Sequence, residues 1–268
     1  MSERDGGAAA MTAASGSGAA LLCTLVAGGE GAPLHLVPSV GTTPMSLLRL
    51  ARAISPRRPV RSFAYAGLED EGPPHDSLEA MAAAYVAELL AMSPRGPYLL
   101  GGHCLGGAVA LEMALQLEAA GHEVARLAVL DSVAPLLASD GSWSERQAAG
   151  GAEVAAVEKH LRSALEEIIA RTVGHYPALA PDVFRRLSAL LRSHIDAGVA
   201  YRARPLRAPL RVLRTEGCRD AVLDGWTRIA TGGLSLHDVP GDTFSMLRPP
   251  HVEAVGETLG RVLEGGER

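Results

Sequence analysis

The sequence predicts an α/β fold, in which a mostly parallel sheet carries helices on both faces and a helical lid is inserted between two strands. Three observations predict it. Short apolar runs alternate with helical patterns along the chain, as they do in βαβ units. The run Tyr98–Gly102 is continuously apolar, which is typical of a strand covered on both faces. From about residue 135 to residue 203 the strand pattern stops and only helical patterns remain.

The elements that precede this central strand alternate in type. Two short apolar runs, Leu21–Val26 and Pro33–Val37, are separated by a glycine-rich turn and are expected to form a strand pair. Apolar residues at helical spacing predict a helix in Ser46–Ile54. A third strand is predicted in Pro59–Tyr65.

Two long helices are predicted on either side of the central strand. The first covers Leu78–Met92, and Asp76 with Glu79 gives it a start that resembles a capping box. The second covers Ala108–Ala120, and Gly121 stands where a helix commonly ends in a left-handed residue.

The remaining elements frame the lid. An apolar strand is predicted over Val124–Leu130, directly before Asp131. The lid, at about residues 135–203, is expected to hold two helices, Glu153–Val173 and Pro181–Tyr201. Beyond it the sheet resumes and a helix closes the chain, in the segments Leu210–Leu213, Leu234–Val239 and His251–Leu263.

Length and composition favour a single domain. The 268 residues are 47% hydrophobic, which is enough to bury one large core. We therefore expect one α/β domain over residues 21–265. Residues 1–20 are rich in Ala, Gly and Ser and lack the apolar centre of a signal peptide, so we expect a disordered tail.

Charge and cysteine content exclude several function classes. The net charge of −5 gives no basic footprint for nucleic acid. No apolar run approaches the roughly 18 residues of a membrane span. Three cysteines at unrelated spacings suit reduced thiols, and no Cys/His spacing resembles a metal site. We expect a cytoplasmic protein that binds no metal and contacts neither nucleic acid nor membrane.

The most informative stretch is Gly102-His103-Cys104-Leu105-Gly106. A strand that turns sharply into a helix needs small residues two positions before and two positions after the turning residue, and both are glycine here. This spacing is that of the nucleophile elbow of α/β-hydrolases, with cysteine in place of the usual serine. Asp131 ends the next predicted strand, so we expect it at the same edge of the parallel sheet as Cys104.

The chain resembles the thioesterases of nonribosomal peptide and polyketide synthesis over about residues 21–265. The elbow, the acid and a C-terminal motif occur in the family's order, in Pro97–Gly107, Leu130–Ser132 and Val239–Met246. The resemblance implies an α/β-hydrolase fold. It also implies substrates carried as thioesters on the phosphopantetheine of an acyl or peptidyl carrier protein or synthetase module, and no further cofactor.

The resemblance also implies the roles of the site residues. Cys104 would accept the acyl group, and Asp131 would be the acid of the triad. The oxyanion hole would be formed by the backbone N–H of Leu105 and that of Val40, in the loop after an early strand. Second choices for the acid, from the more general hydrolase arrangement, are Glu216 and Asp220.

The C-terminal motif departs from the family at the general base. The family has Gly-Asp-His-Phe, whereas this chain has Gly241-Asp242-Thr243-Phe244, so Thr243 stands at the position of the missing histidine. A threonine hydroxyl does not take up a proton near neutral pH. A cysteine can still react, because a few per cent of it is thiolate at pH 7 and the N-terminus of the following helix is expected to lower its pKa further.

Other histidines are candidates for a substitute base. His103 neighbours the nucleophile, His237 lies on the last predicted strand, and His251 begins the closing helix. For each of the three, the alternative is a purely structural role. The histidines of the lid reach the site only if the lid folds over Cys104; they are His160, His175 and His194.

These observations lead to an expected function and two alternatives. We expect an acyl-transfer enzyme with an acyl-Cys104 intermediate that is released by transfer or cyclisation in preference to hydrolysis, since hydrolysis needs a base to activate water. The alternatives are an editing thioester hydrolase with a relocated base and a degenerate, non-catalytic module that binds a carrier protein. Arginines of the lid are candidates for docking an acidic carrier protein: Arg162, Arg171, Arg185, Arg186 and Arg192.

Overall fold

A seven-stranded sheet forms the centre of the computed structural model, which describes residues 21–54, 58–68, 73–137, 159, 162–163, 181–216 and 225–265. The strand order is β1-β3-β2-β4-β5-β8-β9, and all neighbours are parallel except β1 and β3. The strands are β1 (Leu22–Val26), β2 (Leu34–Val37), β3 (Val60–Phe63), β4 (Tyr98–His103), β5 (Val124–Leu130), β8 (Leu210–Arg214) and β9 (Leu234–Asp238).

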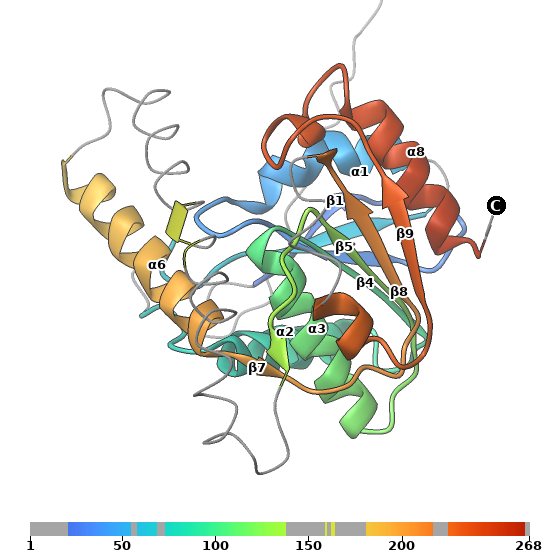
Figure 1. Ribbon diagram of the computed structural model, residues 1–268, viewed down its shortest axis with the longest axis horizontal. Coiled ribbons are helices and arrows are strands. Elements are labelled where there is room, and N and C mark those ends of the chain that lie inside the picture. The colour runs from blue at the N-terminus through green and yellow to red at the C-terminus, as the bar shows by residue number, and fades with distance from the viewer. Residues whose placement is uncertain are drawn as a thin grey trace, which may run out of the picture.

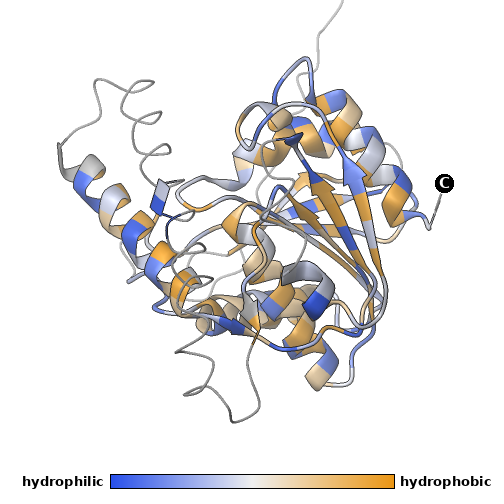
Figure 2. Ribbon diagram, in the orientation of Figure 1, coloured by the Kyte–Doolittle hydropathy of each residue, from blue (hydrophilic) through white to orange (hydrophobic). Residues whose placement is uncertain are grey.

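Helices cover both faces of this sheet, as expected (Figure 1). One face carries α1 (Leu48–Ile54) and α8 (Val252–Leu263), which close one buried apolar cluster. The opposite face carries α2 (Leu78–Met92) and α3 (Leu105–Ala119), which close a second cluster. Figure 2 shows hydrophobic residues concentrated along the central strands between the two helical layers. Shorter helical segments are η1 (Pro44–Leu47), residues 225–229 and η3 (Ser245–Leu247).

The expected pairing of the first two strands is wrong. β1 pairs antiparallel with β3, in the register Leu22↔Phe63, and β3 lies between β1 and β2. The chain leaves β2, crosses through α1 and returns as β3 parallel to β2, as a βαβ crossover does. The outer edge of β3 is then free for β1. The glycine-rich turn between the first two strands therefore connects two strands that are not neighbours.

The two long helices begin and end at residues that satisfy their free backbone groups. Ser77, rather than the expected Asp76, caps α2: its side chain accepts a hydrogen bond from the Ala80 N–H at 3.2 Å. Helix α3 ends as expected at Gly121, whose φ is +81°. The N–H groups of Gly121 and His122 bond back to carbonyls of α3 at 3.2 and 2.9 Å, which is a Schellman motif.

The lid contains more sheet than the sequence indicated. Two short strands, β6 (Leu136–Leu137) and β7 (Arg202–Ala203), pair in parallel and bring the two ends of the insertion together. Between them, α6 (Pro181–Ala200) agrees with the second predicted lid helix. The first predicted lid helix and the predicted disordered tail lie outside the described residues, apart from the helical residues 159, 162 and 163. In the described part of the chain, every helix is too short or too polar to cross a membrane.

Candidate active site

Cys104 occupies a strained turn between β4 and α3. Its φ of +54° and ψ of −126° lie outside the regions that non-glycine residues usually adopt. A Cβ on Gly102 would lie 2.1 Å from the Gly106 carbonyl oxygen, and a Cβ on Gly106 would lie 2.3 Å from the Pro38 carbonyl oxygen. Both glycines are therefore required, because the strand, the helix and the end of β2 approach too closely for any side chain.

Asp131 lies beside this turn at the end of the neighbouring strand. In the parallel pair of β4 and β5, His103 lies opposite Leu130, and the Cys104 N–H donates to the Leu130 carbonyl at 2.9 Å. Asp131 itself has a φ of +46°. Among the described residues, Cys104 and Asp131 are the non-glycine residues with positive φ. Such strain persists where the surrounding structure holds it in place, and it is common at functional sites.

The Asp131 carboxylate is buried and has hydrogen bonds on both oxygens. Oδ1 accepts from the backbone N–H of Thr215 at 3.0 Å and from its hydroxyl at 2.7 Å. Oδ2 accepts from the hydroxyl of Thr243. The hydroxyl at the family's histidine position thus donates to the carboxylate that would orient the histidine. The second-choice acid Glu216 is exposed, and Asp220 lies outside the described residues.

Two hydrogen-bond donors next to the Cys104 thiol, the hydroxyl of Ser39 and the backbone N–H of Leu105, lower its pKa. Burial is the larger effect, and with the nearby Asp131 charge it raises the pKa above that of an ordinary thiol. The expectation of a lowered pKa is therefore wrong, because desolvation of the thiolate exceeds the stabilisation by these donors. Val40 is buried and directly follows Ser39, so the expected second oxyanion donor lies in the loop that approaches Cys104.

The raised pKa predicts how Cys104 reacts with electrophiles as pH changes. The thiolate is the reactive form, so the rate of alkylation by iodoacetamide should rise about tenfold per pH unit and continue to rise beyond pH 8.5. Peptide mapping of the alkylated protein separates Cys104 from the other thiols, and a Cys104→Ala variant provides the background. A plateau below pH 7 would show that the helix N-terminus outweighs burial.

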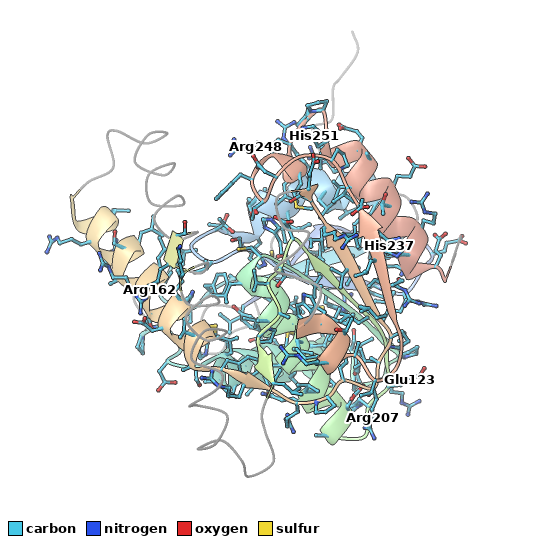
Figure 3. The ribbon with its side chains drawn as sticks, in the orientation of Figure 1. Glu123, Arg162, Arg207, His237, Arg248 and His251 are labelled. Carbon is cyan, nitrogen blue, oxygen red and sulfur yellow. The ribbon has the colours of Figure 1, made fainter. Side chains whose placement is uncertain are left out.

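No described histidine is hydrogen-bonded to Cys104. His103 Nε2 donates to the Thr243 carbonyl at 2.8 Å, its Nδ1 is buried without a partner, and burial lowers the pKa of its ring. His237 lies on β9 with Nε2 2.8 Å from the Ser235 hydroxyl. Figure 3 shows His251 at the start of α8, well apart from His237. The ring of His251 lies next to Gly241.

The lid helix α6 packs over the loop that reaches Cys104. A Cβ on Gly41 would lie 2.3 Å from a Leu191 methyl carbon, so α6 and the loop are in direct contact. The ring of His194, also on α6, lies 4.7 Å from that of Tyr65, measured between centroids. His160 and His175 lie outside the described residues, so His194 is the lid histidine that the structure places near the site.

Three residues of this site were missed by sequence reasoning. Ser39 lies next to the Cys104 thiol and lowers its pKa, Thr215 donates two hydrogen bonds to Asp131, and the hydroxyl of Tyr65 donates to the Pro38 carbonyl at 2.7 Å. Of these three, only Ser39 could have been found from the sequence, because it directly precedes Val40 in a loop of small residues. Of the other thiols, Cys23 lies half-buried on β1 and Cys218 lies outside the described residues. The described residues contain no group of three or more Cys, His, Asp or Glu that could hold a metal ion.

Residues 32–263 match the family model of the thioesterase domain. The indigoidine synthase of Dickeya dadantii (strain 3937) is 24% identical over 252 residues, which are 86% of this chain and 17% of the synthase. The chain therefore spans less than a fifth of the length of this relative.

Solved structures that align with this chain include a nonribosomal peptide synthetase and a thioesterase domain. A four-domain nonribosomal peptide synthetase bound to AMP and glycine aligns with a TM-score of 0.71 and 25% identity, over 91% of this chain and 20% of the synthetase. The Vlm2 thioesterase domain, with genetically encoded 2,3-diaminopropionic acid and bound with a dodecadepsipeptide, aligns with a TM-score of 0.69 and 26% identity. That alignment covers 90% of this chain and 97% of the domain.

Proposed function

Since the chain belongs to the thioesterase domain family, we propose that it is an acyl-transfer enzyme with a cysteine nucleophile. Its substrates would be acyl, aminoacyl or peptidyl groups held as thioesters on a carrier protein of nonribosomal peptide or polyketide synthesis. The group would pass to Cys104 and then to an acceptor other than water.

The contact between Thr243 and Asp131 is the observation that carries this proposal. In a serine or cysteine triad, the acid binds the Nδ1–H of a histidine whose other nitrogen takes up the proton. Here Oδ2 of the Asp131 carboxylate accepts the Thr243 hydroxyl, so among the described residues the expected acid is bonded to a hydroxyl where a histidine would stand. A water molecule attacking an acyl-Cys104 would lack the group that activates it. An acyl-enzyme without this base should outlive one with a complete triad.

Acylation itself does not need that base. The Cys104 thiolate attacks the thioester carbonyl, and the tetrahedral oxyanion would be stabilised by the backbone N–H groups of Leu105 and Val40. Collapse breaks the bond to the pantetheine sulfur, which leaves as a thiolate and takes the proton that Cys104 had lost to solvent. One thioester replaces another, so the free energy changes little.

Release then depends on an acceptor that is a better nucleophile than water. A carrier-protein thiol would regenerate a thioester, and an amine would form an amide, with cyclisation when the amine belongs to the same acyl chain. In both reactions the acceptor loses its proton to solvent. Cys104 leaves as a thiolate and takes up a proton to become a thiol again. Thiols and amines react with thioesters without a protein base more readily than water does.

The outer side of α6 offers a surface for the carrier protein. Arg185, Arg186 and Arg192 are exposed on this helix, while Arg162 forms an ion pair with Asp196 at 3.4 Å. Arg171 lies outside the described residues. We further propose that the exposed arginines of α6 steer an acidic carrier protein or synthetase module to the lid.

One alternative has an observation in its favour. The raised pKa of Cys104 and the missing base would suit a non-catalytic module that binds a carrier protein. The strained backbone at Cys104 and Asp131 opposes it, because a binding module has no need to hold a thiol in such a turn. The other alternative, an editing hydrolase, needs a relocated base, and no described histidine is bonded to Cys104.

Intact mass spectrometry of the protein with a loaded carrier tests the proposal. We expect a mass increase equal to the acyl group, located on Cys104 by peptide mapping, which decays slowly in buffer and rapidly when a thiol or amine acceptor is added. The Cys104→Ala variant should show no increase. Product formation that is unaffected by this variant would refute the covalent mechanism.

A further inference from the structure

The loop after β2 places a buried hydroxyl group next to the nucleophile. Ser39 is 6% exposed, and its hydroxyl lies beside the Cys104 sulfur as a hydrogen-bond donor. Acyl transfer to Cys104 uses a backbone N–H of this loop, that of Val40, and assigns no task to the Ser39 side chain. The hydroxyl is therefore a polar group at the reacting atom whose role is open.

The backbone on both sides of this hydroxyl is held in place by other residues. The Pro38 carbonyl accepts a hydrogen bond from the Tyr65 hydroxyl at 2.7 Å. The same carbonyl approaches α3 so closely that a Cβ on Gly106 would lie 2.3 Å from its oxygen. The Ser39 carbonyl accepts from the N–H and the hydroxyl of Thr42 at 3.2 and 2.7 Å. The backbone of Ser39 is thus fixed by these neighbours, and its own hydroxyl is left to the nucleophile.

Ser39 begins a tight turn that is also packed against the lid. Gly41 is the third residue of this turn and has a φ of +69°, as a type II turn requires. A Cβ on Gly41 would lie 2.3 Å from a Leu191 methyl carbon, so α6 packs directly on the turn. A donor on a loop that is held from several sides is already oriented before the reaction, and it needs little reorganisation when a charge develops beside it.

The titratable groups that face Cys104 do not supply a positive charge to its sulfur. The negative charge of Asp131, at the end of β5, adds to burial in raising the pKa of the thiol. Burial also raises the pKa of Tyr65, in the segment after β3, so its phenol is neutral near pH 7. Thr243 donates to Asp131 and cannot act as the imidazolium of a Cys–His pair does. The Ser39 hydroxyl is the side-chain donor that the described residues place at this sulfur.

We propose that Ser39 is a further catalytic residue, whose hydroxyl donates a hydrogen bond to the Cys104 thiolate both when it attacks a thioester and when it leaves the acyl-enzyme. This inference rests on the proposed acyl transfer and adds the group that stabilises the sulfur in place of an imidazolium. Ser39 keeps its proton throughout. In acylation, the bond from Cys104 to the carbonyl carbon forms and the bond to the pantetheine sulfur breaks. In release, the acceptor bonds to that carbon, and the electron pair of the breaking C–S bond returns to Cys104.

The hydrogen bond matters most when Cys104 is expelled. Burial raises the pKa of Cys104 above that of an ordinary thiol such as pantetheine, and the thiol with the higher pKa leaves more slowly. A tetrahedral intermediate formed by an acceptor thiol would therefore collapse back to the acyl-enzyme more readily than it would release product. A donor that stabilises the departing Cys104 thiolate shifts this partition towards release.

The pH profile of alkylation tests the hydrogen bond without any acyl substrate. The rate of Cys104 modification by iodoacetamide is measured by peptide mapping from about pH 7 to about pH 10 for the wild-type chain and for Ser39→Ala. At neutral pH the variant should react about three- to tenfold more slowly, because its thiolate lacks one charge-assisted hydrogen bond, although each thiolate formed is somewhat more nucleophilic. The two rates should converge as pH rises and both thiols ionise.

Two further variants separate the hydrogen bond from packing. Ser39→Thr keeps the hydroxyl and should restore most of the wild-type rate. Ser46→Ala removes an exposed hydroxyl at η1 that bonds to Thr42 and Thr43, and it should leave the profile unchanged. An unchanged profile in Ser39→Ala would overturn the inference. So would an equal loss at every pH, because a donor to the thiolate changes the rate only where the thiol is largely protonated.

The two acyl-transfer steps are then followed by intact mass in the same variants. Acylation by an acyl pantetheine thioester, and release of the washed acyl-enzyme to free pantetheine, should both slow in Ser39→Ala by about the same factor as alkylation. Unchanged rates of both steps would overturn the catalytic role of Ser39. A wild-type chain that is never acylated would instead refute the proposed function, since alkylation reports on the Ser39 hydrogen bond without acyl transfer.

Discussion

The Cys104→Ser variant should lose acyl-enzyme formation almost completely, by on the order of 10³-fold or more relative to the wild-type chain. In a thioesterase with a complete triad, serine is an effective nucleophile because a histidine removes its proton. Here the base position is Thr243, whose hydroxyl donates to Asp131 and takes up no proton. A thiol forms some thiolate unaided even with the raised pKa of Cys104, whereas a serine hydroxyl forms almost no alkoxide near neutral pH.

The rate of mass increase after mixing with an acyl pantetheine thioester measures this effect. The matched control is the double variant Cys104→Ser/Thr243→His, which restores the usual nucleophile and the usual base together and should regain acylation. A Cys104→Ser variant that keeps a tenth or more of the wild-type rate would show that another base already serves the nucleophile.

The positions of Cys104 and Asp131 at one edge of the sheet were predictable from sequence because local rules determine them. The elbow needs Gly102 and Gly106, and the distances to the Gly106 and Pro38 carbonyls show that no larger residue fits. Asp131 follows an apolar strand that is parallel to β4, and parallel neighbours end at one edge. In these places the residue type and its spacing carry the structural information directly.

The parts that sequence reasoning missed depend on contacts between distant segments. β1 pairs with the edge of β3 that remains free after β3 has paired with β2. No local sequence pattern indicates which edge that is. Thr215 is 84 positions from Asp131 and an ordinary strand-end residue by its surroundings in sequence. The pKa of Cys104 was misjudged because helix position is visible in a sequence, whereas the burial that outweighs it is a property of the folded chain.

Thr243, which stands where the family has a histidine, is connected to the residues around it. Loss of a histidine can accompany loss of the contacts around it, but here the neighbouring residues remain connected by hydrogen bonds. The Asp131 carboxylate is bonded on both oxygens, and His103 fixes the backbone of the Thr243 loop through the Thr243 carbonyl. The site is therefore built around threonine, and its chemistry should be that of a nucleophile without an attached base.

The Thr243→His variant should convert this chemistry towards hydrolysis. The Thr243 hydroxyl already bonds to Asp131 Oδ2, so the Nδ1–H of a histidine at this position can use the same acceptor and leave Nε2 free to take up a proton. The side chain of Thr243 is half-buried, which leaves room for a larger ring on the solvent side. A general base of this kind should raise hydrolysis of acyl-Cys104 by about 10²-fold or more.

The decay of the acyl-enzyme in buffer, followed by intact mass, measures that rate, and the ratio of free acid to transfer product shows how the acyl group is released. Thr243→Val is the matched control, because it keeps the shape of threonine and supplies no base, so its acyl-enzyme should persist as in the wild-type chain. If Thr243→His hydrolyses no faster than Thr243→Val, a base elsewhere in the molecule already activates water. If it does hydrolyse faster, the threonine at this position is what keeps the acyl group available for an acceptor other than water.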